Sequence, residues 1–203
     1  MFLTLQGEGF HAGRAAVFCR FVGCNLWSGR ESDRLVSECT FCDTDFVGND
    51  GPGGGKFRDP EMLADQLQRT WGAKRADPFV VFTGGEPLLQ LDSLLVDAAH
   101  RRGFQVAVET NGTIPPVAGV DWLTVSPKGS THLRVTAGQE LKLVFPQPTA
   151  RPEQFEELGF EHFFLQPMDG RNLHENTREA VEYCLDRPKW RLSVQMHKVV
   201  GIA

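Results

Sequence analysis

Three cysteines carry the clearest chemical signal in this sequence. Cys24, Cys39 and Cys42 form the spacing C-x14-C-x2-C. Two thiolates separated by two residues can reach one metal centre, and the third arrives over a longer loop. Three thiolates bind three irons of a cubane cluster and leave the fourth iron open to another ligand, whereas a structural zinc site takes four closed ligands. The triad therefore favours a 4Fe–4S cluster with one open iron.

The two remaining cysteines are expected in the core. Side chains alternate along a strand, so if Arg20 faces a ligand, Cys19 points into the opposite packing layer. Cys184 lies on a predicted helix beside Val181 and Leu185, a pattern typical of buried positions. Free cysteine behaves as a small hydrophobe when it is buried. We therefore predict that neither residue is a fourth metal ligand.

A pair of glycines follows a strongly apolar segment. Phe79–Thr83 predicts a buried strand that runs into a Gly-Gly-Glu-Pro segment at residues 84–87. Two glycines let the backbone approach a ligand closely, and the carboxylate of Glu86 suits a ligand's ammonium group. The alternative is a plain strand-to-helix turn, which the cysteine triad in the same chain makes less favoured.

The elements that must position these residues alternate along the chain. Strands are predicted over Ala15–Val22, Phe79–Thr83, Phe104–Glu109, Trp122–Ser126, Leu141–Phe145, His162–Gln166 and Arg191–Gln195. Helices are predicted from Pro60 to Gly72 and over Leu91–Arg102, Pro152–Leu158 and Glu175–Asp186. This alternation predicts an α/β fold with a mostly parallel sheet and covering helices. Ligands of such sheets bind at the carboxyl ends of the strands, which singles out the residues just after each strand.

We expect residues 1–203 to form a single domain. The chain of 203 residues has about the length of one domain, and it contains no internal repeat. Gly48–Gly55 is predicted to be a flexible loop inside the domain, because structured patterns resume on both sides of it. This loop belongs to an insertion at about residues 24–56 that carries the cysteines.

The composition excludes several classes of protein. The chain is 41% hydrophobic and 23% charged, which excludes a disordered or fibrous protein. Its formal charge of −5 leaves no basic surplus for a dedicated DNA- or RNA-binding protein. No apolar stretch approaches the roughly 18 residues of a membrane span, and the first residues lack the pattern of a signal peptide. These features predict a cytoplasmic protein with no membrane or nucleic-acid partner.

Seven segments, in order along the chain, carry the chemical residues. They are Leu5–Gly9, Phe18–Phe21, the cysteine loop up to Phe46, Thr83–Pro87, Glu109–Gly112, Ser126–Lys128 and Gln166–Gly170. Together they resemble the radical S-adenosylmethionine (SAM) superfamily, in which an aromatic residue precedes the last cysteine, as Phe41 does here. The first cysteine spacing departs from the usual C-x3-C-x2-C and resembles a subset of the 7-carboxy-7-deazaguanine synthases. The resemblance covers almost the whole chain and implies a partial (β/α) barrel.

The resemblance implies a radical SAM lyase. It would convert 6-carboxy-5,6,7,8-tetrahydropterin to 7-carboxy-7-deazaguanine with release of ammonia, on the route to queuosine and other 7-deazapurines. A 4Fe–4S cluster would bind SAM at its open iron, and one-electron cleavage would give a 5′-deoxyadenosyl radical. That radical takes hydrogen from C6 of the pterin, the ring rearranges, and the hydrogen returns to the product, so SAM is regenerated. The cofactors supply this chemistry, and the protein orients and shields them.

The same resemblance implies roles for residues of this chain. Those implied to hold the cluster are Cys24, Cys39 and Cys42, and those implied to contact SAM are Phe41, Cys42, Asp43, Gly85, Ser126, Pro127, Lys128, Gln166, Pro167, Met168 and Asp169. Those implied to bind the substrate are Leu5, Gln6, Gly7, Glu8, Arg20, Thr83, Glu109 and Ala203, the last through its terminal carboxylate. Thr44 matches a ligand of Mg²⁺, an ion that takes few protein ligands and keeps several waters.

Some of these roles are also supported by the chemistry of the side chain, and others have alternative interpretations. Arg20 offers a planar fork of donors suited to a carboxylate. Alternative interpretations remain for Glu8, Lys128 and Asp169 (solvated charges), Thr44 (a loop cap), Phe41 (core packing) and Leu5–Gly7 (an N-terminal strand). His197, after the last predicted strand, is a further candidate to approach the pterin. The other histidines show no ligand spacing and are expected to be structural or on the surface.

Two other functions remain open. One is a radical SAM activase that makes a glycyl radical on a partner protein, although Arg20 with Leu5–Gly7 suits a small anionic heterocycle better. The other is a non-catalytic zinc-binding interaction module. For the favoured function, the resemblance implies a homodimer and an electron donor such as a flavodoxin.

Overall fold

The computed structural model describes residues 1–202 and contains one eight-stranded sheet. Its strands are β1 (Phe2–Leu5), β2 (Ala15–Phe21), β3 (Phe79–Gly84), β4 (Gln105–Thr110), β5 (Trp122–Val125), β6 (Ala137–Phe145), β7 (Gly159–Pro167) and β8 (Trp190–Leu192). They lie side by side in chain order, with β1 antiparallel to β2 and all later neighbours parallel. No pairing within residues 1–202 joins β8 to β1, so the sheet is open, as in a partial barrel. The predicted α/β fold with a mostly parallel sheet is confirmed.

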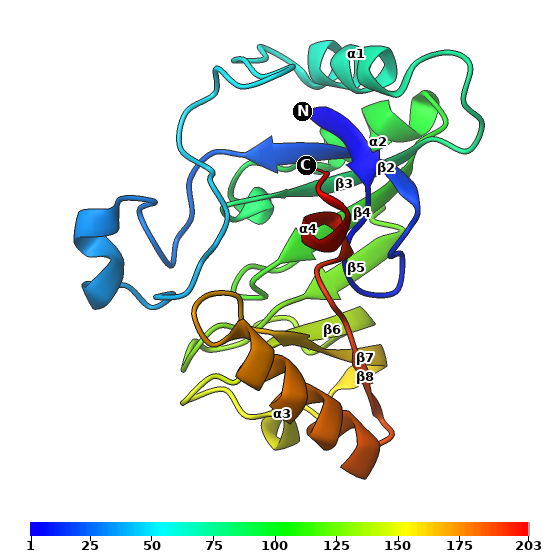
Figure 1. Ribbon diagram of the computed structural model, residues 1–203. Coiled ribbons are helices and arrows are strands. Elements are labelled where there is room, and N and C mark those ends of the chain that lie inside the picture. The colour runs from blue at the N-terminus through cyan, green and yellow to red at the C-terminus, as the bar shows by residue number, and fades with distance from the viewer. Residues whose placement is uncertain (203) are drawn as a thin grey trace.

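The larger helices gather near the two ends of the sheet (Figure 1). They are α1 (Pro60–Trp71), α2 (Ser93–Arg101) and α3 (Leu173–Asp186). The short α4 (Met196–Val200) lies in front of the middle strands, and the 3-10 helices are η1 (Glu31–Val36), η2 (Pro87–Leu89) and η3 (Pro152–Gln154). α1 and α2 pack on each other beside β2 and β4, whereas α3 packs against β7 and β8. Every described helix is too short or too polar to cross a bilayer.

Local sequence explains where α1 and α2 begin. Asp59 accepts a hydrogen bond from the backbone N of Met62 at 2.8 Å, and Asp92 accepts one from Leu95 at 2.9 Å. Both are N-caps that satisfy a free amide of the first helical turn. Gly72, with φ of 81°, ends α1 in a conformation that favours glycine.

The helix-covered face of the sheet holds the main hydrophobic core. Val17, Val80 and Val106 are fully buried there, together with apolar residues of α1, α2 and α3. Cys19 belongs to this core, and Cys184 packs against it. The prediction that these two cysteines are packing residues is confirmed. Burial raises the pKa of the Cys19 thiol to about 12, which keeps it protonated.

The opposite face changes in character along the strands. Near the amino ends of the parallel strands it holds a small apolar cluster of Ala16, Phe79, Val81 and Ala107. Farther along the same strands, Arg20 lies opposite Thr83 in the register of β2 and β3. Because side chains alternate across a strand, the even-numbered residues of β2 lead from Ala16 to Arg20 on this one face. Polar groups therefore appear where the strands end.

The structure corrects two predicted elements. Residues 152–158 form only the turn η3, with hydrogen bonds from Phe155 to Pro152 and from Leu158 to Phe155. They do not form a helix because β7 already begins at Gly159 and the apolar side chains turn back onto the core. The last strand is predicted to end at Gln195, but β8 ends three residues earlier, at Leu192, and α4 begins at Met196. The insertion around Gly48–Gly55 is irregular apart from η1, which agrees with the predicted loop.

Candidate functional site

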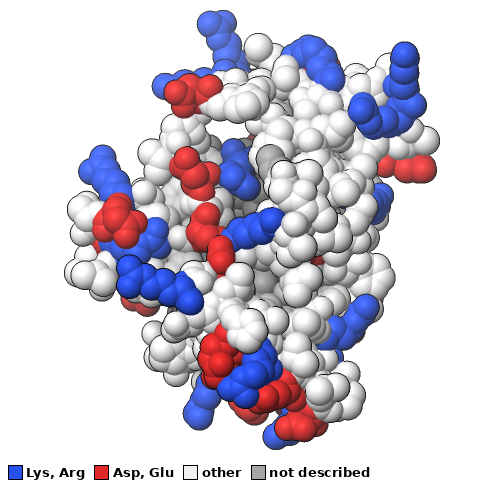
Figure 2. All heavy atoms as spheres, in the orientation of Figure 1, with Lys and Arg blue, Asp and Glu red and all other residues white. Residues whose placement is uncertain are grey.

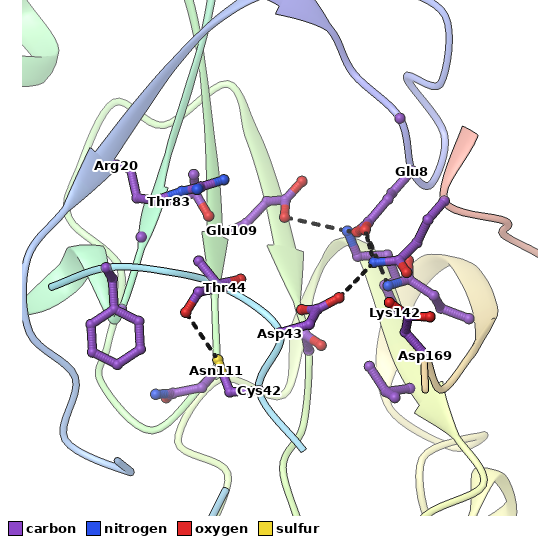
Figure 3. Close-up of a pocket in the computed structure, with 18 of the residues that line it drawn as sticks. Glu8, Arg20, Cys42, Asp43, Thr44, Thr83, Glu109, Asn111, Lys142 and Asp169 are labelled. Carbon is purple, nitrogen blue, oxygen red and sulfur yellow. Dashed lines mark hydrogen bonds and ion pairs between the residues drawn. The ribbon is translucent and has the colours of Figure 1, made fainter. Parts of the chain in front are cut away.

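A cavity of about 360 Å³ opens at the carboxyl ends of the parallel strands. The predicted site residues that line it are Leu5, Gln6, Gly7, Glu8, Arg20, Cys24, Cys39, Phe41, Cys42, Asp43, Thr44, Thr83, Gly85, Glu109, Ser126, Lys128, Gln166, Pro167, Met168 and Asp169, together with His197. Pro127 does not line the cavity, and its carbonyl oxygen accepts a hydrogen bond from Gln147 at 3.2 Å. Ala203 lies outside the described residues. The fold thus brings seven separate segments of the chain to one place (Figure 3).

The three cysteines form one wall of this cavity, the cysteine side. They lie in a small cluster with the buried side chains of Trp27 and Phe46. Two contacts hold the cysteine loop in shape. The backbone N of Cys39 donates to the carbonyl of Leu26 at 3.4 Å, and Nη1 of Arg34 donates to the carbonyl of Cys42 at 3.0 Å. Among residues 1–202, no three His, Cys, Asp or Glu side chains are grouped as ligands of a single metal ion.

The thiols of the cysteine side differ in how easily they ionise. A hydrogen bond between the Cys39 and Cys42 thiols lowers the pKa of Cys42 to about 6 and raises the pKa of Cys39. Burial raises the pKa of Cys24. Lys128 lies near this pair, and its Nζ is 5.8 Å from the centre of the Phe41 ring. Since the thiolate is the metal-binding form, Cys42 is the cysteine of this pair that is better prepared to bind a metal.

The two glycines after β3 allow a close approach of two loops. A Cβ on Gly84 would lie 2.2 Å from the carbonyl oxygen of Phe21, and a Cβ on Gly85 would lie 1.9 Å from that of Gly23. The backbone N of Gly85 donates to Phe21 at 3.1 Å, which ties the end of β3 to the end of β2. Glycine is therefore needed here to seat the segment that carries Cys24 beside the cavity.

The carboxylate of Glu86 has a structural role. It is fully buried and accepts hydrogen bonds from Thr110 Oγ1 and Asn111 N, both at 2.8 Å, and from Leu88 N at 3.0 Å. These bonds hold the ends of β3 and β4 together. The prediction that this carboxylate meets a ligand's ammonium group is wrong, because its oxygens point into the protein and away from the cavity.

Arg20 extends into the cavity from the end of β2. Its guanidinium lies 5.6 Å from the centre of the Phe2 ring, and beside it is Thr83 on β3 (Figure 3). Within residues 1–202 the guanidinium forms no ion pair. A planar fork of donors without a carboxylate partner is suited to bind an anionic ligand.

Gln6, Glu8, Glu109 and Lys142 form a second wall, the carboxylate side. Nζ of Lys142 lies 2.6 Å from Glu8 Oε2 and 3.3 Å from Glu109 Oε2, and Nε2 of Gln6 donates to Glu109 Oε1 at 2.7 Å. Lys142 is only 4% exposed. Burial opposes its charge, but the two carboxylates raise its pKa above the ordinary value. Lys142 in turn keeps the pKa of Glu8 low against the effect of burial.

Polar side chains of the last segment complete the rim. Nζ of Lys198 lies 2.7 Å from Asp43 Oδ2 and 2.6 Å from Asp169 Oδ2. Although burial alone would raise it, these contacts and one from Gln195 keep the pKa of Asp43 below its usual value. Figure 2 shows acidic and basic side chains next to one another around the hollow in this face. Asp169 is exposed, as its alternative interpretation predicted, and it is also ion-paired with Lys198 at the rim.

Sequence reasoning missed several residues of the cavity. They include Asn111, Lys142, Gln195 and Lys198. Lys142 carried a usable signal, because it and Glu140 are charged residues that alternate with buried leucines in a strand, which places both charges on one face. Lys198 carried none, since its partners lie far away in the chain.

Comparisons with known proteins agree with this arrangement. The radical SAM superfamily model matches residues 36–197. A 7-carboxy-7-deazaguanine synthase of Bordetella pertussis is 65% identical and covers 100% of this chain and 96% of its own, and one of Caulobacter vibrioides is 62% identical with the same coverage. A crystal structure titled QueE from Escherichia coli covers 97% of this chain and 92% of its own, with 26% identity and a TM-score of 0.66. The chain belongs to the 7-carboxy-7-deazaguanine synthase family of the radical SAM superfamily.

Membership of this family confirms the predicted resemblance and an enzymatic function, and it implies a 4Fe–4S cluster and SAM as cofactors. The described residues fit both groups. Three cysteines line one cavity, which leaves the fourth coordination position of a cubane for SAM. The half-buried Lys128 lies near the thiols of Cys39 and Cys42, where its positive charge offsets thiolate charge. The family therefore favours an enzyme over the zinc-binding interaction module.

Proposed function

We propose that this protein converts 6-carboxy-5,6,7,8-tetrahydropterin to 7-carboxy-7-deazaguanine with release of ammonia, in 7-deazapurine biosynthesis. The observation that carries the proposal is one cavity with a cysteine triad on one wall and the unpaired guanidinium of Arg20 with the carboxylate side on the other. When bound, the cluster and SAM supply radical initiation. The protein's part is to bind the pterin beside SAM and to keep water out.

On the carboxylate side, the polar groups match the edges of a carboxylated pterin. Arg20 binds the substrate carboxylate through its fork of donors. Glu109 and Gln6, already hydrogen-bonded to each other at 2.7 Å, accept and donate at the edge of the flat ring, with Leu5, Gly7 and Thr83 as its neighbours. Lys142 keeps the carboxylates of Glu8 and Glu109 ionised before substrate binds. Glu8 and its partners close this edge of the ring.

On the cysteine side, Cys24, Cys39 and Cys42 hold the cluster. SAM would be held by the proposed contact residues, of which Phe41, Asp43, Gly85, Ser126, Lys128, Gln166, Pro167, Met168 and Asp169 line the cavity and Pro127 does not. Nζ of Lys128 donates to Ser126 Oγ at 2.5 Å, and this contact orients the residues after β5 toward the cofactor. Pro127 acts only through its backbone position, since it does not line the cavity.

Three further parts of the proposal concern partners. Thr44 lines the cavity next to Asp43, and its hydroxyl with the pterin carboxylate would hold Mg²⁺. The terminal carboxylate of Ala203 would meet the guanidine-like edge of the pterin. The protein would act as a cytoplasmic homodimer reduced by a flavodoxin-like donor.

An anaerobic assay tests the proposal. The reconstituted protein is given the carboxylated tetrahydropterin, SAM, dithionite and Mg²⁺, and both 7-carboxy-7-deazaguanine and remaining SAM are quantified. We expect product in excess of the SAM consumed, with about four irons and four sulfides per chain. A fully loaded protein that forms no product would contradict the proposed reaction, and zinc without sulfide would contradict the cluster. Omission of Mg²⁺ with addition of a chelator tests the role of Thr44.

A further inference from the structure

Apolar packing does not explain the position of α4. None of its five residues is buried, and Val199 and Val200 are 79% and 56% exposed. Short helices in proteins usually owe their stability to an apolar face packed against the rest of the fold. In Figure 1, α4 lies in front of the middle strands of the sheet, and His197 and Lys198 line the cavity. Polar contacts hold the helix in this position.

Lys198 makes the contacts that reach the cysteine side. Its Nζ donates to Oδ2 of Asp43 at 2.7 Å and to Oδ2 of Asp169 at 2.6 Å. Asp43 follows Cys42 in the cysteine loop, and Asp169 follows β7, so one ammonium joins two segments that share no strand or helix. It also donates to Oε1 of Gln195 at 2.8 Å, a third contact that fixes where the ammonium points.

Gln195 and Met196 make the contacts that reach the carboxylate side. Nε2 of Gln195 donates to Glu8 Oε1 at 2.9 Å, and the backbone N of Met196 donates to the carbonyl of Gly7 at 2.9 Å. Gly7 leaves room for the helix, because a Cβ there would lie 2.0 Å from Nδ1 of His197. The segment therefore touches both sides of the cavity at the same time.

We infer that Lys198 is a positioning residue that holds α4 closed over the cavity. The closed helix keeps solvent out, so that the radical formed on the cysteine side reacts with substrate on the carboxylate side. The closure follows from the contacts alone, whereas its role in shielding a radical rests on the proposed function. An ammonium between two carboxylates offsets their repulsion. Partly exposed ion pairs are individually weak, which suits an element that opens for ligands and closes again.

Two substitutions and one control test this inference. Lys198→Met keeps most of the side-chain volume and removes the charge, and Lys198→Arg keeps a cation that can contact two carboxylates. Lys74→Met is the matched control, because Lys74 is exposed on the loop between α1 and β3. The first measurement needs no cofactor: amide hydrogen exchange of residues 196–202, followed from milliseconds. We expect exchange about fivefold faster in Lys198→Met, as the loss of weak ion pairs predicts, and near wild-type exchange in Lys198→Arg and Lys74→Met.

The second measurement uses the loaded enzyme. The ratio of released 5′-deoxyadenosine to 7-carboxy-7-deazaguanine reports how often cleavage of SAM fails to act on substrate. At saturating pterin we expect this ratio to rise about fivefold in Lys198→Met and to return toward wild type in Lys198→Arg. A general loss of stability would lower both products together and leave the ratio unchanged.

The outcomes separate the inference from the proposed function. Unchanged exchange in Lys198→Met overturns the closure, whatever the activity. Faster exchange with an unchanged product ratio overturns the shielding role. A wild-type enzyme that forms no 7-carboxy-7-deazaguanine overturns the proposed reaction and with it the shielding role, while the exchange data still decide whether Lys198 holds α4.

Discussion

The cysteine side and the carboxylate side of the cavity are organised in different ways. On the carboxylate side, Lys142 lies within 3.3 Å of both Glu8 and Glu109, so the chain itself offsets part of the carboxylate charge. On the cysteine side, the thiols of Cys39 and Cys42 interact chiefly with each other, and only Cys42 has a lowered pKa. The carboxylate side is thus formed before any ligand binds, whereas the cysteine side is completed by its cluster. Substitutions on the two sides should therefore fail in different ways.

The largest effect is expected on the cysteine side. Cys39→Ala removes one of three proposed cluster ligands, so iron loading should be lost and product formation should fall below about one-thousandth of wild type. Iron and sulfide analysis with the anaerobic assay measures both. Cys184→Ala is the control, because Cys184 packs against the core and should keep both properties. Full iron loading and turnover in Cys39→Ala would show that the ligand assignment is wrong.

On the carboxylate side the effect should appear first in stability. Lys142→Met leaves two partly buried carboxylates without their cation, which costs about 3 kcal/mol of unfolding free energy, the lower end of the range for a buried pair. Urea unfolding of the cluster-free protein measures this loss, and Lys74→Met serves as the exposed control. Iron loading of the variant that remains folded should be normal. A change below about 1 kcal/mol, the range of exposed ion pairs, would mean that the carboxylate side is not organised by Lys142.

Glu140 provides a pH test of the same region. It precedes Lys142 by two residues on the same face of β6, and burial raises its pKa to about 7 from 4.5. Between these two pH values the folded protein binds a proton that the unfolded chain has lost. The contribution of this proton to stability is therefore fully present below about pH 4.5. It is lost as the pH rises to about 7, and the loss is roughly 3 kcal/mol. Unfolding free energies at pH 5 and pH 8 should show a smaller fall in Glu140→Gln, and equal falls would contradict the assigned titration.

The smallest of these effects is expected at Arg20, which has no ion-pair partner among residues 1–202 to leave uncompensated. Arg20→Ala should raise the KM for the pterin roughly 10- to 100-fold, as for a lost hydrogen bond to a charged group. Stability and substrate-independent cleavage of SAM should stay near wild type, because the lost contact is to substrate. Steady-state kinetics over a range of pterin concentrations provides the measurement, and an unchanged KM would argue against substrate binding by Arg20.

Much of the fold followed from local sequence. Short apolar runs correctly placed the central strands and the first two helices, and the observed N-caps Asp59 and Asp92 are local signals of the same kind. The prediction failed at residues 152–158, where helix-forming residues occur but β7 starts too soon for a helix. It also missed α4, because a five-residue helix without an apolar face has no periodic pattern to detect.

The candidate site was predictable where residues occur in motifs, and less so elsewhere. The cysteines, Arg20 and the loop residues all line one cavity because parallel strands end at the same edge. Lys142 pairs with Glu8, and Lys198 pairs with Asp43. In both pairs the two residues lie more than one hundred positions apart in the chain. Such pairs are fixed by tertiary structure, so no local pattern indicates them. The prediction for Glu86 failed for the same reason, since its hydrogen-bond partners Thr110 and Asn111 lie at the end of the following strand.

The strictly consecutive order of the strands has a consequence for how the molecule assembles. Each strand pairs with its neighbour in the chain, so most pairings close loops of modest length, although β2 and β3 pair across 63 residues, as Val17 with Val80. The contacts across the cavity span far more chain, 187 residues between Glu8 and Gln195 and 155 between Asp43 and Lys198. They form only when the first and last parts of the polypeptide meet. Before α4 docks, the cysteine side therefore lacks the contact of Lys198 with Asp43, and the carboxylate side lacks that of Gln195 with Glu8.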